Sequence, residues 1–249
     1  MPAIFSISID DGGLSDIRVA EILARHGMRG TFFIPIHNRE GARVLGQAQI
    51  REIGRQFELG SHTYDHCFLD AVDWRTAGFQ VRQGKHRLEE MTGAAVPGFC
   101  YPGGKFSKAH ESLVAEAGFH YARSTRSLCL DIGRRYAMGT TCQFYPHAAG
   151  AYVRNYLRQG DWAGRRRGLL AALRGRDWLS RIYALFELAC DEGGVFHLWG
   201  HSGDFDNCGI WDEFEAFIAY AGGCIPQSAR MTNLQLANLA LEPVLQVGA

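Results

Sequence analysis

Phe5-Ser-Ile-Ser-Ile-Asp10-Asp11-Gly12-Gly13, close to the start of the chain, joins an apolar segment to an acidic turn. The alternating apolar residues predict a buried strand, and the two glycines predict a sharp turn directly after it. Two adjacent carboxylates are costly to hold together unless a metal ion or a proton neutralises one of them. The stretch therefore predicts a strand that ends in a functional site.

A second stretch, Gly60-Ser61-His62-Thr-Tyr-Asp-His66, follows another short apolar segment. Two histidines four residues apart, together with a carboxylate, form a donor set that suits a borderline metal ion such as Zn²⁺. The alternative is that these histidines are ordinary capping or surface residues. Because the acidic pair and the histidine pair both follow predicted strands, we favour a shared metal site.

The residues between and after these stretches alternate between strand and helix patterns, with glycine-rich turns after the strands. Helices are predicted over 14–27, 47–56, 74–91 and 107–117, and strands over 31–35, 57–61, 98–101 and 119–123. Repeated strand–helix units of this kind indicate a parallel sheet, whose carboxyl-end edge is where sites form. The fold class expected is α/β.

The pattern is weaker after residue 124. We expect a strand over 138–144, a helix over 169–190, a strand over 194–199, and helices over 211–220 and 231–241. The strand 194–199 leads directly into His201, whereas His197 within it is interpreted as a core histidine. With no linker, repeat or low-complexity segment, residues 1–249 are expected to form a single catalytic domain.

Composition limits the class of protein. Hydrophobic residues make up 47% of the 249 residues and charged residues 21%, which is typical of a globular protein with a sizeable core. The formal net charge is zero, which argues against a nucleic-acid partner. No secretory signal precedes the first strand, no apolar run is long enough for a transmembrane segment, and the seven cysteines are scattered and odd in number. These features predict a cytoplasmic protein with reduced thiols.

Four motifs together resemble the polysaccharide deacetylase (NodB-homology) family. They are Ile9-Asp-Asp-Gly12, Ser61-His-Thr-Tyr-Asp-His66, Phe99-Cys-Tyr-Pro-Gly-Gly104 and Leu198-Trp-Gly-His201. Their order and spacing match the family from residue 4 to about 240. The resemblance implies a distorted (β/α) barrel, usually with seven strands, that uses a divalent metal ion to hydrolyse N-acetyl groups on sugars.

The resemblance also implies roles for individual residues. Asp11, His62 and His66 would bind the metal ion, Asp10 would be the general base, and His201 would be the general acid that protonates the leaving amine. Zinc suits this ligand set, and cobalt, nickel or manganese would be held by the same residues. The physical logic is independent of the family, because three protein ligands leave open coordination positions for water and the amide carbonyl.

The third motif departs from the family, which commonly has an arginine that orients the base where this chain has Cys100. Arg123, at the end of the following strand, is our candidate for the missing guanidinium. Cys100 itself is not expected to be a nucleophile, since nothing nearby in the sequence would lower its pKa.

Other residues of these motifs are expected to bind substrate, namely Tyr101, Gly103, His147 and Trp199. A backbone N–H of Tyr101 or Gly103 is the expected oxyanion donor. The residue that supports His201 is open between Asp161, in an Asp-Trp pair, and His147.

Seven arginines lie between residues 158 and 181, at positions 158, 165, 166, 167, 174, 176 and 181. They are interpreted either as a solvated helix face or as a phosphate site, because arginine binds phosphate in a bidentate manner. A cytoplasmic deacetylase would meet nucleotide- or lipid-linked sugars, so the second interpretation predicts a phosphate-linked N-acetylated (or formylated) amino sugar from surface polysaccharide (O-antigen or lipopolysaccharide) biosynthesis.

Two other functions remain open from the sequence. The first is a cytoplasmic amidohydrolase with the same fold that acts on a small non-sugar amide or ureide. The second is a catalytically inactive barrel that only binds glycan; Cys100 in the place of arginine favours it, whereas the intact acidic and histidine residues argue against it.

Overall fold

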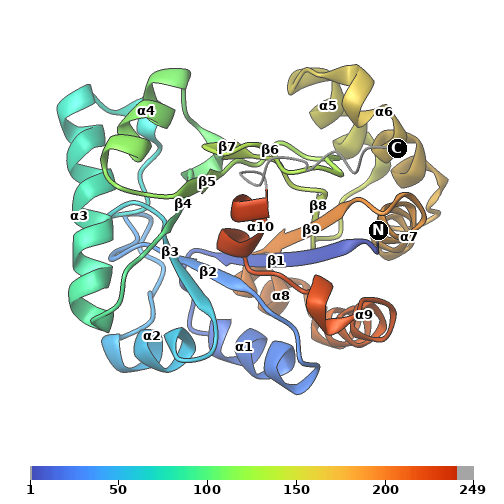
Figure 1. The fold of residues 1–249 in the computed structure, drawn as a ribbon, viewed down its shortest axis with the longest axis horizontal. Helices are drawn as coiled ribbons and strands as arrows, with labels where there is room; N and C mark the ends of the chain where they lie inside the picture. The colour runs from blue at the N-terminus through green and yellow to red at the C-terminus, as the bar shows by residue number, and fades with distance from the viewer. Residues whose placement is uncertain (1, 240–249) are drawn as a thin grey trace, which may run out of the picture.

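The structure is a computed structural model that describes residues 2–239. Its centre is one curled sheet with the strand order β6-β7-β5-β4-β3-β2-β1-β9-β8 (Figure 1). Neighbouring strands pair in parallel, except that β6 and β7 form an antiparallel hairpin. The strands are β1 (Ile4–Asp10), β2 (Thr31–Ile34), β3 (Glu58–Ser61), β4 (Gly98–Cys100), β5 (Tyr121–Arg123), β6 (Gly133–Arg134), β7 (Ala137–Met138), β8 (Cys142–Gln143) and β9 (Val195–Gly200).

Helices cover the outside of the curled sheet, and one further helix, α10, lies near its centre in Figure 1. The α-helices are α1 (Asp16–Arg25), α2 (Gln47–Gly54), α3 (Trp74–Thr92), α4 (Lys108–Glu116), α5 (Ala149–Arg158), α6 (Trp162–Arg174), α7 (Trp178–Glu192), α8 (Ser202–Cys208), α9 (Trp211–Cys224) and α10 (Asn233–Leu239). Single 3₁₀ turns occur at Leu69–Ala71, Pro102–Gly104 and Gln227–Ala229. None of the helices within residues 2–239 combines the length and apolar character that crossing a bilayer requires.

The two faces of the sheet carry different side chains, because successive residues of a strand point to opposite sides. On β1, Phe5 and Ile7 belong to the large core shared with the outer helices. Ser6, between them, donates a hydrogen bond from its hydroxyl to Asn233 Oδ1 of α10. Leu236 of α10 packs in a second, smaller core with strand residues. Helix α10 therefore fills the inner side of the sheet, where polar and apolar side chains are mixed.

The predicted fold class is confirmed as α/β with a curled NodB-type sheet. The sheet has nine strands instead of the expected seven, because residues 133–138 add the short hairpin β6–β7 at one edge. No pairing within the described residues joins β6 to β8, so the sheet stays open.

The elements before residue 124 begin and end within a few residues of the predicted bounds, but two later predictions are wrong. The strand expected over 138–144 is two short strands, β7 and β8. The helix expected over 169–190 is broken between α6 and α7 at Gly175, where a Cβ atom would lie 2.5 Å from the backbone nitrogen of Arg181. Asp177 then caps α7 by accepting a hydrogen bond from the Ser180 backbone N–H. Helices α5 and α8 were not expected, and residues 240 and 241 of the last predicted helix lie outside the described residues.

Candidate metal centre and active site

The acidic pair and the histidine pair meet at the carboxyl-end edge of the sheet. Asp10 is the last residue of β1, and His62 directly follows β3, with β2 between these strands. Asp11 (φ 78°), Thr63 (φ 67°) and His66 (φ 59°) all have left-handed backbone conformations. Such conformations cost free energy in residues other than glycine, and they concentrate at functional sites. Here the side chains of Asp11 and His66 turn toward His62 beyond the strand ends.

Asp11, His62 and His66 have the geometry of a metal-ligand set. Asp11 Oδ1 lies 3.4 Å from His62 Nε2 and 3.2 Å from His66 Nε2. Ligand atoms that each lie about 2.0–2.1 Å from a tetrahedral ion are roughly 3.3 Å apart, so these separations fit one ion among the three atoms. Asp11 Oδ1 is also buried without a hydrogen-bond partner among the described residues. The residues present therefore fit a divalent metal ion.

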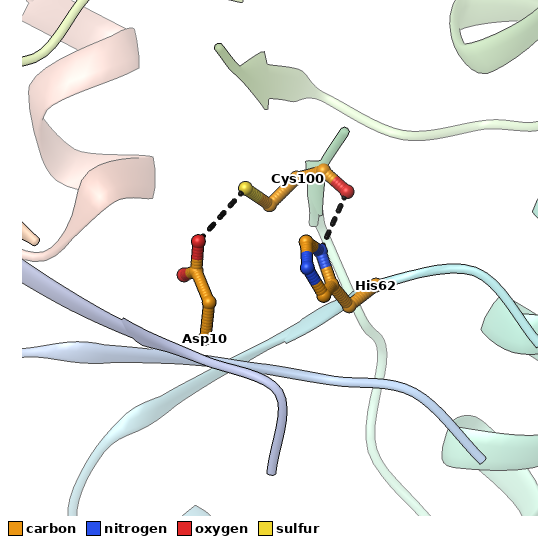
Figure 2. Close-up of side chains that lie close together, drawn as sticks. All are labelled: Asp10, His62 and Cys100. Atoms are coloured by element: carbon orange, nitrogen blue, oxygen red, sulfur yellow. Dashed lines mark hydrogen bonds between the residues drawn. The ribbon is translucent and has the colours of Figure 1, made fainter. Parts of the chain in front are cut away.

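The protonation of Asp11 and the orientation of the His62 ring also suit metal binding. Burial alone would raise the pKa of the Asp11 carboxyl, but the neighbouring His62 and His66 hold it well below its usual range. His62 Nδ1 lies 2.8 Å from the backbone carbonyl oxygen of Cys100, to which it donates a hydrogen bond (Figure 2). That bond leaves the lone pair of His62 on Nε2, the atom next to Asp11. An anionic carboxylate and a correctly oriented imidazole are thus in place.

Asp10 lies beside this set, but its environment is different. The side chain is only 4% exposed, and burial raises its carboxyl pKa despite the nearby His62 and His201. Figure 2 shows the Cys100 thiol pointing at the Asp10 carboxylate, with Sγ 3.3 Å from Oδ2. Burial and the Asp10 charge raise the pKa of this thiol, so Cys100 is a protonated donor and not a thiolate ligand. Asp10 Oδ1 has no partner within residues 2–239 and is free to accept a proton.

His201 faces the same centre from the end of β9. Its Nε2 lies 3.7 Å from Asp11 Oδ2, and its Nδ1 lies 2.8 Å from Asp204 Oδ2. Burial acts to lower the pKa of His201, but the carboxylates of Asp204, Asp11 and Asp10 raise it to about 9. An imidazolium is therefore favoured at neutral pH, with its Nε2–H toward the metal-ligand set.

Asp204, which the sequence analysis did not identify, holds the position that was left open between Asp161 and His147. It lies on α8, three residues after His201, and a His-x-x-Asp spacing at a helix start was the signal available in the sequence. Asp161 instead forms an ion pair with Arg126. His147 is linked to Asp204 through Gln143. Gln143 Oε1 lies 2.9 Å from His147 Nε2, and Gln143 Nε2 lies 3.4 Å from Asp204 Oδ2.

Arg123 does not contact the predicted base. Its guanidinium donates hydrogen bonds to Asn233 Oδ1 and to the Gly139 carbonyl, and no bond to Asp10 occurs in the described part of the chain. Burial lowers the pKa of Arg123 to about 10, while Tyr121, Cys100 and Asp10 act to raise it. Arg123 therefore acts on the base only as a nearby buried charge, and Cys100 supplies the direct hydrogen bond.

The two backbone donors proposed for the oxyanion differ in availability. The Tyr101 N–H donates to the Arg123 carbonyl as part of the β4–β5 pairing, so it is occupied. The Tyr101 ring is fully buried, stacks on Phe106 and donates its hydroxyl to the Tyr136 carbonyl. The Gly103 N–H has no such bond within the described residues.

The other predicted substrate-binding residues line one cavity beside the metal-ligand set. The cavity has a volume of about 670 Å³, and Gly103, His147 and Trp199 are part of its wall. The Trp199 ring meets the His201 ring edge-on, at 5.2 Å between centroids. The cavity therefore adjoins His201, whose Nε2 lies 3.7 Å from Asp11 Oδ2 of the metal-ligand set.

Comparison with known proteins agrees with this geometry. The family model for polysaccharide deacetylase matches residues 3–122. A solved structure described as a polysaccharide deacetylase of Mycobacterium smegmatis is 18% identical, with a TM-score of 0.65 over 100% of this chain and 96% of that one. The chitin deacetylase of the fungus Colletotrichum lindemuthianum is 16% identical, with a TM-score of 0.59, and the match covers 93% of this chain and 86% of that one.

The structure of the deacetylase PplD of Streptococcus pyogenes matches a smaller part of the chain. It is 15% identical, with a TM-score of 0.50, and covers 54% of this chain and 62% of that one. No curated protein sequence gives a significant match.

The fold, an open curled sheet covered by helices, and the family match are those of carbohydrate de-N-acetylases, which are hydrolases. Residues 3–122, just under half of the chain, match the polysaccharide deacetylase (NodB-homology) family.

Proposed function

We propose that this protein is a metal-dependent hydrolase that removes an N-acetyl or N-formyl group from an amino sugar. The observation that carries the proposal is the convergence of Asp11 Oδ1 with the Nε2 atoms of His62 and His66 at separations of 3.2–3.4 Å. Asp10 on one side and His201 on the other supply a proton acceptor and a proton donor. Sugar deacetylation is the activity named for the neighbouring chitin deacetylase.

Different residues take different roles in the proposed amide hydrolysis. A divalent metal ion bound by Asp11, His62 and His66 would supply Lewis acidity toward the amide carbonyl and lower the pKa of a water molecule. Asp10 Oδ1 accepts the proton of the attacking water, while the Cys100 thiol holds Oδ2 in place.

The remaining steps use hydrogen-bond donors from the ends of two other strands, β4 and β9. The Gly103 N–H donates to the oxygen on which negative charge develops. His201 Nε2–H then protonates the departing amine nitrogen, and Asp204 stabilises the imidazolium before that transfer. One carbon–nitrogen bond breaks, and the products are the free amino sugar and the carboxylic acid.

The substrate proposed is a phosphate-linked precursor of surface polysaccharide, with zinc as the metal ion. Zinc is favoured by the donor set of two imidazoles and one carboxylate, although cobalt, nickel and manganese accept the same ligands. The precursor is a nucleotide- or lipid-linked amino sugar, which is the form that a cytoplasmic enzyme would meet.

The test is metal content measured by elemental analysis, together with release of acetate or formate from N-acylated amino sugars. We expect nearly one divalent ion per wild-type chain, and loss of both metal and activity in the His62→Ala, His66→Ala double variant. The matched control is His86→Ala with His120→Ala, since both of these histidines are exposed and lie apart from the site.

Absence of metal from the wild type, even after zinc or cobalt is added back, would contradict the proposal. Metal retention with hydrolysis only of small non-sugar amides would move the function to the alternative amidohydrolase. Metal retention with sugar binding but no hydrolysis would indicate an inactive glycan-binding barrel.

A further inference from the structure

The cavity beside the metal-ligand set is formed by the part of the chain that follows β4. Its wall comes from the loop after β4, the loop after β5, and helix α5. These segments lie at the carboxyl ends of parallel strands, the same edge that carries the metal-ligand set. With a volume of about 670 Å³, the cavity is in the size range of small-molecule sites.

The charge of this wall has a single sign. It includes Lys105, Arg126, Arg134 and Arg158, and none of its described residues is Asp or Glu. Arg126 and Arg134 form ion pairs outside the wall, with Asp161 and Glu111. Lys105 and Arg158 form no ion pair within residues 2–239. The cavity thus carries an excess of positive charge in a chain whose formal net charge is zero.

Two buried hydrogen-bond donors on this wall also lack acceptors. Tyr152 is only 5% exposed, and its hydroxyl has no hydrogen-bond partner among the described residues. The Nε–H of Arg126 is likewise buried and unpartnered. Both donors are shielded from solvent, so they mark a polar lining that the described residues leave unsatisfied. Burial also raises the pKa of the Tyr152 hydroxyl, so it remains a donor.

The arginine-rich segment that the sequence singled out contributes little to this wall. Of its seven arginines only Arg158 lines the cavity. Arg165 is buried and donates to backbone carbonyls, including those of Ser127 and Gly160. Arg167 forms an ion pair with Glu192. A phosphate site made by α6 itself is therefore not supported, whereas one in the neighbouring cavity is.

We propose that this cavity binds a phosphate or diphosphate group of the substrate, while the N-acylated sugar lies at the metal-ligand set. The inference rests on the proposed function, because it assigns two ends of one substrate to two neighbouring sites. Lys105 and Arg158 contact the phosphate oxygens as unpaired cations, and Arg126 and Arg134 add positive charge to the same wall. Trp199, between the two sites, lies alongside the sugar.

The test compares three substrates that share one acylated sugar: UDP-N-acetylglucosamine, N-acetylglucosamine 1-phosphate and methyl N-acetylglucosaminide. With metal-loaded wild type we expect kcat/KM to be at least about tenfold higher for the phosphorylated substrates, since each charge-assisted hydrogen bond is worth about a factor of ten. Lys105→Met and Arg158→Gln should each remove about tenfold of this preference and leave hydrolysis of the methyl glycoside unchanged. Arg166→Gln, an exposed arginine on α6 outside the cavity, is the matched control.

The two phosphorylated substrates distinguish the kind of phosphate. A preference for UDP-N-acetylglucosamine alone assigns the cavity to a nucleotide diphosphate, and an equal preference for the 1-phosphate assigns it to a simple phosphate ester. Equal kcat/KM on all three substrates, or loss of the preference in Arg166→Gln but not in Arg158→Gln, would overturn the inference.

A binding measurement keeps this inference separate from the proposed function. UDP titrated calorimetrically into full-length chain freed of metal by chelation should bind, and Lys105→Met with Arg158→Gln should weaken that binding by about tenfold or more. If no sugar is hydrolysed but UDP binds in this way, the proposed reaction fails and the phosphate site remains. If sugars are hydrolysed and both substitutions leave the affinity for UDP unchanged, the phosphate site is contradicted and the proposed reaction stands.

Discussion

Residues 3–122 and residues 123–239 build the two sides of the candidate active site in different ways. In the first part, regular strands alternate with single helices, and the metal-ligand set directly follows β1 and β3. In the second part, β6, β7 and β8 have two residues each, and long connections and helices α5 to α7 replace the regular units. The family model also ends at residue 122.

The difference separates reaction chemistry from substrate recognition. Residues that directly follow parallel strands are held by the sheet, which suits groups that must keep fixed positions relative to one another. Most of the cavity wall comes from loops and α5, which can differ in length and sequence without disturbing the sheet. His201, the proposed general acid, lies where the two parts meet, since β9 pairs with β1.

The largest effect expected from a single substitution is in the first part, at Asp10. Asp10→Asn keeps the size of the side chain but removes the proton acceptor, so kcat should fall by about 10²–10⁴-fold with metal content unchanged. Steady-state kinetics on an N-acylated amino sugar, with elemental analysis of the same samples, measures both quantities.

Asp16→Asn is the matched control for that substitution. Asp16 is another buried carboxyl near the site; burial raises its pKa well above the usual range, and it accepts a hydrogen bond from Ser202 Oγ at 2.6 Å. An amide replaces a neutral acid at little cost, so activity should change only by a small factor. Equal losses in both variants would show that any change in this polar region disturbs the site, and Asp10 would lose its role as base.

A smaller effect is expected in the second part, at Asp204. Because the Asp204 carboxylate raises the pKa of His201, Asp204→Asn should lower that pKa and shift the alkaline limb of the kcat/KM profile to lower pH. Near neutral pH the rate should fall by only about tenfold, less than the roughly 10²–10⁴-fold of a lost general acid or base, because His201 itself is retained. The pH–rate profile is the measurement, with Asp212→Asn, an exposed carboxylate on α9, as the control. An unmoved alkaline limb would exclude Asp204 as the residue that sets the protonation of His201.

The sequence predicted the fold class and the convergence of Asp10, Asp11 and His201 because each directly follows a strand with a clear apolar pattern. The sheet then fixes where the strand ends lie relative to one another. Cys100 was noticed only as a departure from the family, since its bond to Asp10 joins residues 90 positions apart and has no local pattern.

The cavity could not be predicted for a related physical reason. Lys105, Arg134 and Arg158 come from three segments, and their common position depends on loops whose path is set by tertiary packing. The dense arginine segment attracted attention in the sequence, but helix geometry directs most of those side chains elsewhere. The isolated cations of the loops gave no comparable signal.

The smallest expected effect tests how the two parts are joined, at His197 on β9. His197 is buried, and burial together with the nearby Arg123 holds its pKa well below the usual value, so the folded protein keeps this imidazole neutral. Because the unfolded chain binds a proton there below about pH 6.5 and the folded chain does not, this group destabilises the fold progressively as pH falls. For one such histidine the free energy of unfolding should drop by about 1.4 kcal/mol between pH 7.5 and pH 5.5.

Urea unfolding at both pH values measures this drop. The free energy of unfolding should fall less between pH 7.5 and pH 5.5 in His197→Asn than in wild type. His86→Asn, at an exposed position on α3, should behave as wild type. If the free energy of unfolding falls as much in His197→Asn as in wild type, His197 takes up its proton without disrupting the pairing of β9 with β1.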